Sequence, residues 1–178
     1  MIISIIYDTS WLMYPKYPYW PRNPWIIYPE DSTYQPPYFF DGWKHYDLRI
    51  VVPQEVKQEI MRHYKDDEKK QKAAVARSIV SELMTLKGYE DICLADVPAS
   101  EPTEAILGPD SDVDKKIIGL ARQLCGHEKI VFVASHDGGI KCEVSTLWRV
   151  EKLNIFSPAN EIDFGRAVNP GCDPRKRE

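Results

Sequence analysis

Runs of apolar residues alternate along the chain with stretches in which apolar residues recur at helical spacing. Apolar runs predict strands within 1–10, 48–52, 92–97, 129–134 and 153–156. Apolar positions at a period near 3.6 predict helices over 67–87 and from about 112 to about 126. Strands that alternate with helices indicate a mostly parallel sheet with helices on both faces, which is a three-layer α/β fold.

Particular residues mark where helices begin. Pro53 favours the first turn of a helix, where its missing N–H costs nothing. Either Ser111 or Asp112 is expected to cap the helix that follows the loop at 99–110. Gly138 leads into a further helix, which we expect to reach about Arg149. We expect Gly88 at the end of the helix over 67–87.

The segment 11–46 differs in kind from the rest of the chain. It holds seven of the fourteen prolines and thirteen of the twenty aromatic residues. Proline at this density excludes a regular helix through most of the segment, and aromatic residues at this density are not typical of a disordered linker. We therefore expect one domain over 1–157 with an ordered insertion at 11–46, followed by a tail at 158–178.

Composition and charge limit the class of protein. No stretch approaches the roughly 20 apolar residues that a membrane helix needs, and the apolar start lacks a basic region, so we interpret it as a strand and not as a signal peptide. The four cysteines are widely spaced, which argues against a thiolate zinc site and favours the reducing cytoplasm. The net charge of −4 weighs mildly against a nucleic-acid partner without excluding one.

Four acidic residues stand where the predicted fold would present them to a crevice. Asp8 and Asp137 directly follow apolar strands, and ligands of parallel sheets bind outside the carboxyl ends of the strands. Glu59 lies on the helix after Pro53, and Asp114 lies in the first turn of its helix. Each acid alone has an ordinary explanation as a turn former, a helix cap or a solvated residue. The joint pattern carries the hypothesis.

These residues resemble the motifs of the PIN domain family. Asp8 with Thr9 and an apolar pair resembles the first motif, and Glu59 in VPxxVxxEI occupies the acidic position of the second. Asp114 resembles the inward-facing acid of the third, and Asp137 after VAS and His136 resembles the fourth. The four motifs occur in the family's order over about 1–13 and 47–157.

The resemblance implies a metal-dependent endoribonuclease, either a toxin of a toxin–antitoxin pair or a processing enzyme that acts on single-stranded or structured RNA. Two features depart from the family pattern. Ser135 and His136 stand where the family usually has Thr and Asn, and the proline-rich segment replaces most of an early helix. Serine keeps a hydroxyl that could orient an acid, whereas histidine is bulkier and can titrate.

The chemistry follows from the residue types. Two carboxylates about 4 Å apart repel by roughly 4 kcal/mol at an effective dielectric near 20, so a cluster takes up protons or binds a cation. Ligands that are all oxygen select hard ions such as Mg²⁺ or Mn²⁺. Our hypothesis assigns metal binding to Asp8, Asp114 and Asp137. It assigns water orientation or general base catalysis to Glu59, and an outer or second-metal role to Asp112.

Supporting roles fall to the hydroxyl groups next to the acids, and two other classes of protein remain open. Thr9 and Ser135 are expected to steady the acids by hydrogen bonds. The first alternative is a PIN-like module with weak chemistry that binds protein or RNA. The second is a phosphatase-like hydrolase with Asp8 as nucleophile, which is weakened because such enzymes generally want an acid where Ser10 stands.

The aromatic segment generates a test of its own. Its rings either stack on unpaired bases, worth about 1–3 kcal/mol per base, or they pack on the domain itself or bury an interface with a protein partner or a second copy of the chain. If replacement of Trp20 and Trp25 changes only the oligomeric mass in light scattering, that result supports the interface. A loss of affinity for single-stranded RNA at unchanged mass would instead favour base stacking.

Overall fold

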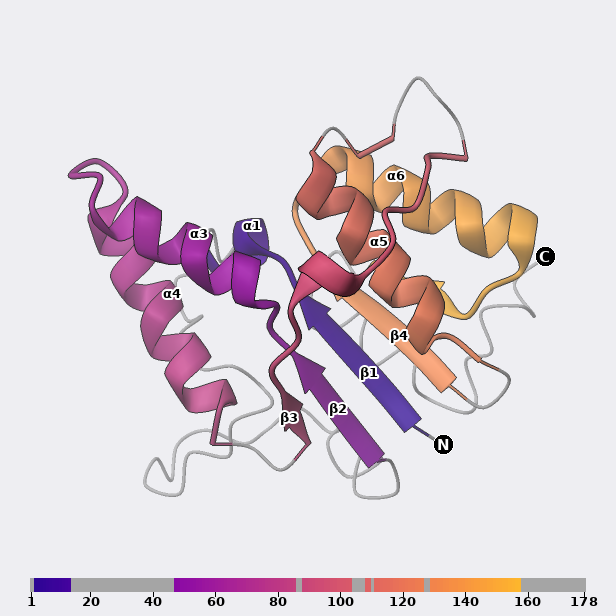
Figure 1. Ribbon diagram of the computed structural model, residues 1–178, viewed down its shortest axis with the longest axis horizontal. Helices are drawn as coiled ribbons and strands as arrows, with labels where there is room; N and C mark the ends of the chain where they lie inside the picture. Colours follow the sequence, from indigo (N-terminus) through magenta and orange to yellow (C-terminus); the bar gives the residue numbers. More distant parts are fainter. Residues whose placement is uncertain are drawn as a thin grey trace, which may run out of the picture.

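The computed structural model describes residues 2–13, 47–85, 88–103, 108–109, 111–126 and 129–157. Their five strands form one sheet in the order β3-β2-β1-β4-β5, and every pair is parallel (Figure 1). The strands are β1 (Ile2–Tyr7), β2 (Asp47–Val51), β3 (Tyr89–Glu90), β4 (Lys129–Ala134) and β5 (Ile155–Phe156). The predicted α/β fold with a parallel sheet is therefore confirmed.

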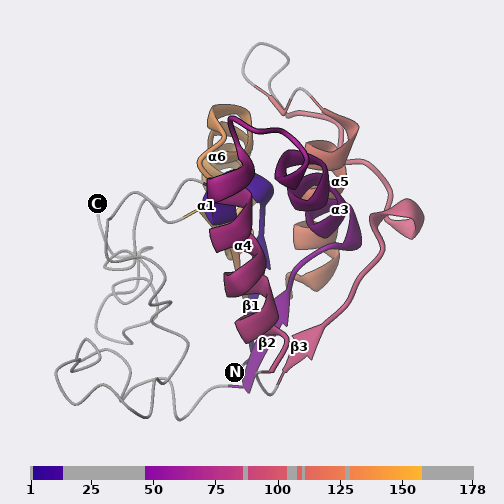
Figure 2. The same cartoon turned by 90° about the vertical axis from the view of Figure 1, so that its left-hand side faces the viewer.

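The helices cover the sheet and extend beyond its carboxyl edge. They are α1 (Thr9–Met13), α3 (Gln54–Tyr64), α4 (Lys70–Leu83), the 3-10 turn η1 (Leu94–Asp96), α5 (Asp112–Leu124), α6 (Gly138–Thr146) and the π-type turn η2 (Leu147–Glu151). Figure 2, which views the sheet from its β3 edge, shows α5 on one side of the sheet and α4 on the other. This arrangement agrees with the three layers expected from the sequence.

The central strand β1 sets the position of the site. It pairs with β2 on one side and with β4 on the other, in a register that ends at Tyr7 opposite Ala134. The chain moves outward from β1 to β3 and then crosses to β4, so the strand order reverses between β1 and β4. Ligands of open parallel sheets bind at such a reversal, outside the carboxyl ends of the strands. The fold thus directs attention to the residues just after Tyr7 and Ala134.

Burial explains why these two strands are almost entirely apolar. Ile3, Ile5 and Ile6 of β1 and Val131 and Phe132 of β4 are fully buried. A parallel strand covered on both faces has no solvent side, and its sequence therefore shows a continuous apolar run without alternation. Both strands were predicted from that run, and β4 has the predicted bounds.

Helix boundaries follow the local signals in most places. Pro53 stands directly before α3, and the Ser111 hydroxyl accepts a hydrogen bond from the Asp114 N–H at 3.0 Å, so Ser111 is the cap and not Asp112. Helix α4 is shorter than the predicted 67–87. Gly88 has a φ of 93°, a conformation that suits glycine, and it stands directly before β3 instead of at the helix end.

The strand predicted at 92–97 is wrong. The ladder with β2 is made by Tyr89 and Glu90, and the chain then forms η1. The Glu55 carboxylate of α3 accepts the Leu94 N–H at 3.0 Å, which removes that group from any strand ladder. Leu94 is buried, so its apolar character reflects packing and not strand pairing.

Two further expectations meet the structure only in part, and two lie outside the described residues. The strand expected over 1–10 ends at Tyr7, because α1 begins at Thr9 and buries Trp11. The helix expected to reach Arg149 gives way to η2 after Thr146. The insertion beyond residue 13 and the tail at 158–178 lie outside the described residues, and so does Cys172. Within the described ranges, no helix has the length and apolar character needed to cross a membrane.

Close packing at one glycine of α5 gives a prediction for stability. A Cβ on Gly119 would stand 2.0 Å from the Pro98 carbonyl oxygen, which is a backbone atom that cannot rotate away. We expect Gly119→Ala to lower the free energy of unfolding by about 1–3 kcal/mol in urea titrations. Gly138→Ala is the control, because nothing lies within 4 Å of its Cβ position. Equal stability of the two variants would contradict this account of the packing.

Candidate functional site

Asp8 lies at the tip of the central strand. Its backbone N–H donates to the Ala134 carbonyl at 3.0 Å, which carries the pairing of β1 with β4 one residue past the strand end. Asp8 is buried, with only 6% of the residue exposed. The acid predicted after β1 is therefore held firmly at the point where the strand order reverses.

Two serines satisfy the buried carboxylate. Oδ2 of Asp8 accepts from the Ser10 N–H at 3.2 Å, from the Ser10 hydroxyl and from the Ser135 hydroxyl at 2.8 Å. The bond from Ser135 joins the tip of β4 to the tip of β1, as expected of that hydroxyl. Burial raises the pKa of Asp8 above its ordinary value, and the hydrogen bonds from Ser10 and Ser135 partly offset that rise.

Ser10 is a site residue that the sequence argument did not select. Besides its bond to Asp8, its hydroxyl lies 3.2 Å from the Ser135 hydroxyl and accepts the His136 N–H at 2.9 Å. One signal was present: an aspartate often accepts the N–H of the residue two positions later in a turn. That signal indicates a local turn, whereas the contact with Ser135 depends on strand pairing.

Asp137 and Asp114 complete an electrostatically coupled set. Asp137 caps α6 by accepting the Ile140 N–H at 2.9 Å, while its own N–H donates to the Ser135 hydroxyl at 3.0 Å. Burial raises the pKa of Asp114, and the negative charges of Asp8 and Asp137 raise it further against the hydrogen bonding from Ser111. Two acids from other segments of the chain thus act on Asp114 through their charges.

Glu59 joins the site through Thr9. The Thr9 hydroxyl donates to Oε2 of Glu59 at 2.6 Å, and Nε2 of His63 lies 3.6 Å from Oε1. Because Thr9 directly follows Asp8, this bond holds α3 against the tip of β1. Thr9 therefore steadies Glu59, whereas Asp8 is steadied by the serines.

The side chains of Asp112 and His136 contact residues other than the four acids. The Asp112 side chain is 75% exposed and lies 3.7 Å from Lys116. It shares no hydrogen bond or ion pair with Asp8, Asp114 or Asp137 among the residues described. The His136 ring stacks on Trp11, with centroids 4.7 Å apart and planes at 26°. His136 therefore packs against α1 beside the site, and its backbone N–H enters the serine network.

The segment before α5 ties α5 to α6. The Ser100 N–H donates to the Lys115 carbonyl at 3.0 Å on α5. The Glu143 carboxylate of α6 accepts the Thr103 N–H at 3.1 and 3.0 Å and its hydroxyl at 2.6 Å. Glu143 is only 2% exposed. These bonds fix the two helices that carry Asp114 and Asp137 relative to each other.

The donor set is all oxygen, which is what hard divalent ions select. None of the three aspartates forms an ion pair within the described part of the chain. In the same part, however, no group of three or more His, Cys, Asp and Glu residues could hold a metal ion as it stands. Mg²⁺ commonly binds through one or two carboxylates, with waters and phosphates filling the other positions. The residues fit that kind of site and not a closed cage.

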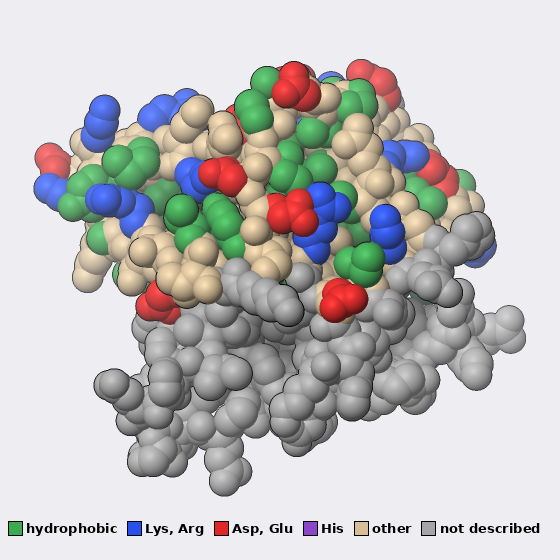
Figure 3. Space-filling view, turned by 60° about the horizontal axis from the view of Figure 1, so that its bottom comes forward, with side chains coloured by type: hydrophobic (Ala, Val, Ile, Leu, Met, Phe, Trp, Pro, Cys, Tyr) green, Lys and Arg blue, Asp and Glu red, His purple; other side chains and the backbone are tan. Residues whose placement is uncertain are grey.

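Figure 3 brings the amino ends of the strands forward, and there acidic and basic side chains lie interspersed with hydrophobic ones. Cys93, Cys125 and Cys142 are free thiols.

Comparison with models of known protein families finds no match, and no curated protein matches the chain. The resemblance to PIN domains therefore remains a prediction.

The raised pKa values give a prediction for stability. Because the folded protein holds protons on Asp8 and Asp114 that the unfolded chain has already released, the free energy of unfolding falls as pH rises from the ordinary aspartate value of 3.8 through the raised values. We expect Asp114→Asn to raise the melting temperature of metal-free protein near neutral pH and to lose that advantage in acid. Thermal unfolding from about pH 4 to about pH 8 tests this.

Asp112→Asn is the matched control for that experiment. It removes a charge from the same helical turn, but Asp112 is exposed and contacts Lys116 in place of the other aspartates. We expect its stability to follow the wild-type pH profile. If Asp114→Asn were less stable than the wild type across the whole range, the coupling of the three aspartates would be refuted.

Proposed function

We propose that the chain is a metal-dependent nuclease that hydrolyses phosphodiester bonds in RNA. One observation carries the proposal: at the reversal of strand order the charges of Asp8 and Asp137, from two other segments, act on Asp114, and none of the three acids has a cationic partner among the described residues. An uncompensated acidic site of this kind favours protonation or a bound cation.

Asp8 and Asp137 would hold Mg²⁺ or Mn²⁺ together with Asp114. When bound, such an ion supplies an activated water and stabilises charge on the phosphate. Ser10 and Ser135 fix the orientation of the Asp8 carboxylate, and the cap of α6 fixes Asp137. These bonds keep the acids in place before a substrate arrives, which lowers the cost of reorganisation during the reaction.

Glu59 is proposed as the group that orients or deprotonates the attacking water. Its exposed fraction of 37% is compatible with access to water, while the Thr9 hydroxyl holds one of its oxygens at 2.6 Å. A positioned base of this kind contributes about 10²–10⁴-fold to the rate. The hydrogen bond from Thr9 sets the direction in which the carboxylate can accept a proton.

The choice of RNA, internal cleavage and a cytoplasmic location rest on the resemblance to PIN domains. The same resemblance supports either a toxin or an RNA-processing role. A second candidate function is a PIN-like module with weak chemistry that binds protein or RNA. It is favoured by the absence, within the described residues, of any group of three acids or histidines ready to hold a metal.

Cleavage assays test the first function. We expect purified protein to cut mixed single-stranded RNA in Mn²⁺ or Mg²⁺ and to stop in a chelator. Asp8→Asn should abolish cleavage, and Glu59→Gln should reduce its rate by about 10²–10⁴-fold. Asp96→Asn is the control, since Asp96 is an exposed acid on η1. Full metal-dependent cleavage by highly purified Asp8→Asn would exclude the proposed assignment.

The module is tested by titration. A calorimetric Mn²⁺ titration that gives no heat, together with no cleavage of mixed RNA, would favour the binding function over the nuclease. Heat in the wild type that disappears in Asp114→Asn would favour the nuclease.

A further inference from the structure

We infer that Arg62 and Lys115 bind backbone phosphates of a single-stranded nucleic acid on the two sides of the acidic site. The inference rests on the proposed function for the identity of the polymer. It addresses a physical difficulty of that function. A polyanion that approaches three carboxylates in a chain of net charge −4 is repelled unless cations stand beside them.

Several cations of the described residues already have a partner. Ion pairs join Arg49 to Glu90, Lys57 to Asp91, Lys116 to Asp112 and Arg122 to Glu151, while Arg77 and Lys70 lie over the Tyr64 ring. For Arg62 and Lys115, the described part of the chain provides no ion pair or ring contact. A phosphate could therefore bind them without first breaking another interaction.

The two residues belong to the helices that carry the site acids. Arg62 lies three positions after Glu59 on α3, and residues at that spacing share a helix face. Its Cβ is tilted toward the start of α3, which is the direction of Glu59. Lys115 directly follows Asp114 in the first turn of α5, where its carbonyl is held by Ser100.

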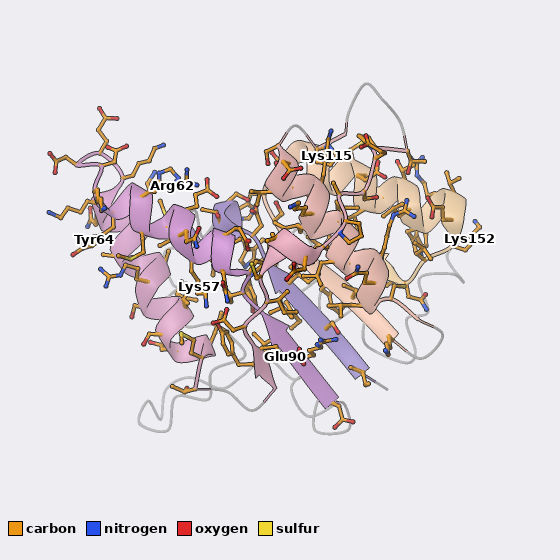
Figure 4. The ribbon with its side chains drawn as sticks, in the orientation of Figure 1. Lys57, Arg62, Tyr64, Glu90, Lys115 and Lys152 are labelled. Carbon is orange, nitrogen blue, oxygen red and sulfur yellow. The ribbon has the colours of Figure 1, made fainter. Side chains whose placement is uncertain are left out.

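The views agree on how the two helices border the site. Figure 4 shows Arg62 on α3 and Lys115 on α5, both toward the end of the molecule to which β1 and β2 point. Figure 2 shows α3 and α5 on the same side of the sheet. Lys152, which follows η2 and likewise has no ion pair among described residues, lies at the far edge of Figure 4. Lys152 therefore provides a positive charge far from the site, which suits a control variant.

The two cations suit phosphate in different ways. The guanidinium of Arg62 offers a planar fork that can donate two hydrogen bonds to one phosphate, whereas the ammonium of Lys115 acts as a point charge. Each neutralised phosphate of a single strand adds about 0.7 to the slope of log affinity against log salt. At about 50 mM salt, one such contact strengthens binding roughly eightfold relative to about 1 M salt.

The test measures binding apart from cleavage. Full-length protein in a chelator is titrated with a fluorescent mixed-sequence single-stranded RNA at several salt concentrations. We expect Arg62→Gln and Lys115→Gln each to weaken binding about fivefold to tenfold at about 50 mM salt and to lower the salt slope by about 0.7. The double variant should lower it by about 1.4. Lys152→Gln should match the wild type.

The outcomes separate this inference from the nuclease itself. If the wild type binds with the expected dependence on Arg62 and Lys115 but never cleaves, the binding surface stands and the nuclease fails. If the wild type cleaves while both variants keep its affinity and salt slope, the inference is overturned. It is also overturned if the wild type fails to bind RNA, or if Lys152→Gln weakens binding as much as the other two.

Discussion

The burial of the Asp8 charge at the tip of the central strand is the constraint around which this end of the molecule is organised. A buried carboxylate costs free energy unless hydrogen-bond donors reach it. Ser10 from the next turn and Ser135 from the end of β4 provide those donors. The same serine hydroxyls accept N–H groups of His136 and Asp137, so one buried charge orders the backbone after both strands.

The remaining acids are brought to that charge by different means. A hydrogen bond from Thr9 holds Glu59, and therefore α3, against the strand tip. The segment before α5 holds Asp114 near Asp137, because it bonds to Lys115 on one helix and to the buried Glu143 on the other. Packing at Gly119 and Gly139 allows this segment to lie directly on both helices. The spacing of the acids is thus a property of helix packing.

Hydrogen bonds hold the acids of the site in place, although burial makes their negative charge costly. Burial raises the pKa values of Asp8 and Asp114, and the charges of Asp8 and Asp137 raise the pKa of Asp114 further, so the two acids destabilise the metal-free fold at neutral pH. Functional sites commonly lower the stability of the fold in this way. A bound metal ion would relieve the repulsion, and Arg62 and Lys115, which have no ion pair among the described residues, would draw a polyanion toward it. On both α3 and α5, the basic residue would then bind the nucleic acid and the acidic residue would take part in its hydrolysis.

By itself, the sequence determined the parallel α/β fold and the places of Asp8 and Asp137. Continuous apolar runs identify doubly buried strands, and the carboxyl ends of parallel strands share one edge. Other features depend on contacts between segments that are distant in the sequence, which the pattern of apolar and polar residues does not contain. The residues 92–97 look like a strand but contain the turn η1 over Leu94–Asp96, where Glu55 accepts the Leu94 N–H. Ser10 enters the site, while Asp112 turns to solvent, because strand pairing and helix rotation fix side-chain directions that residue spacing leaves open.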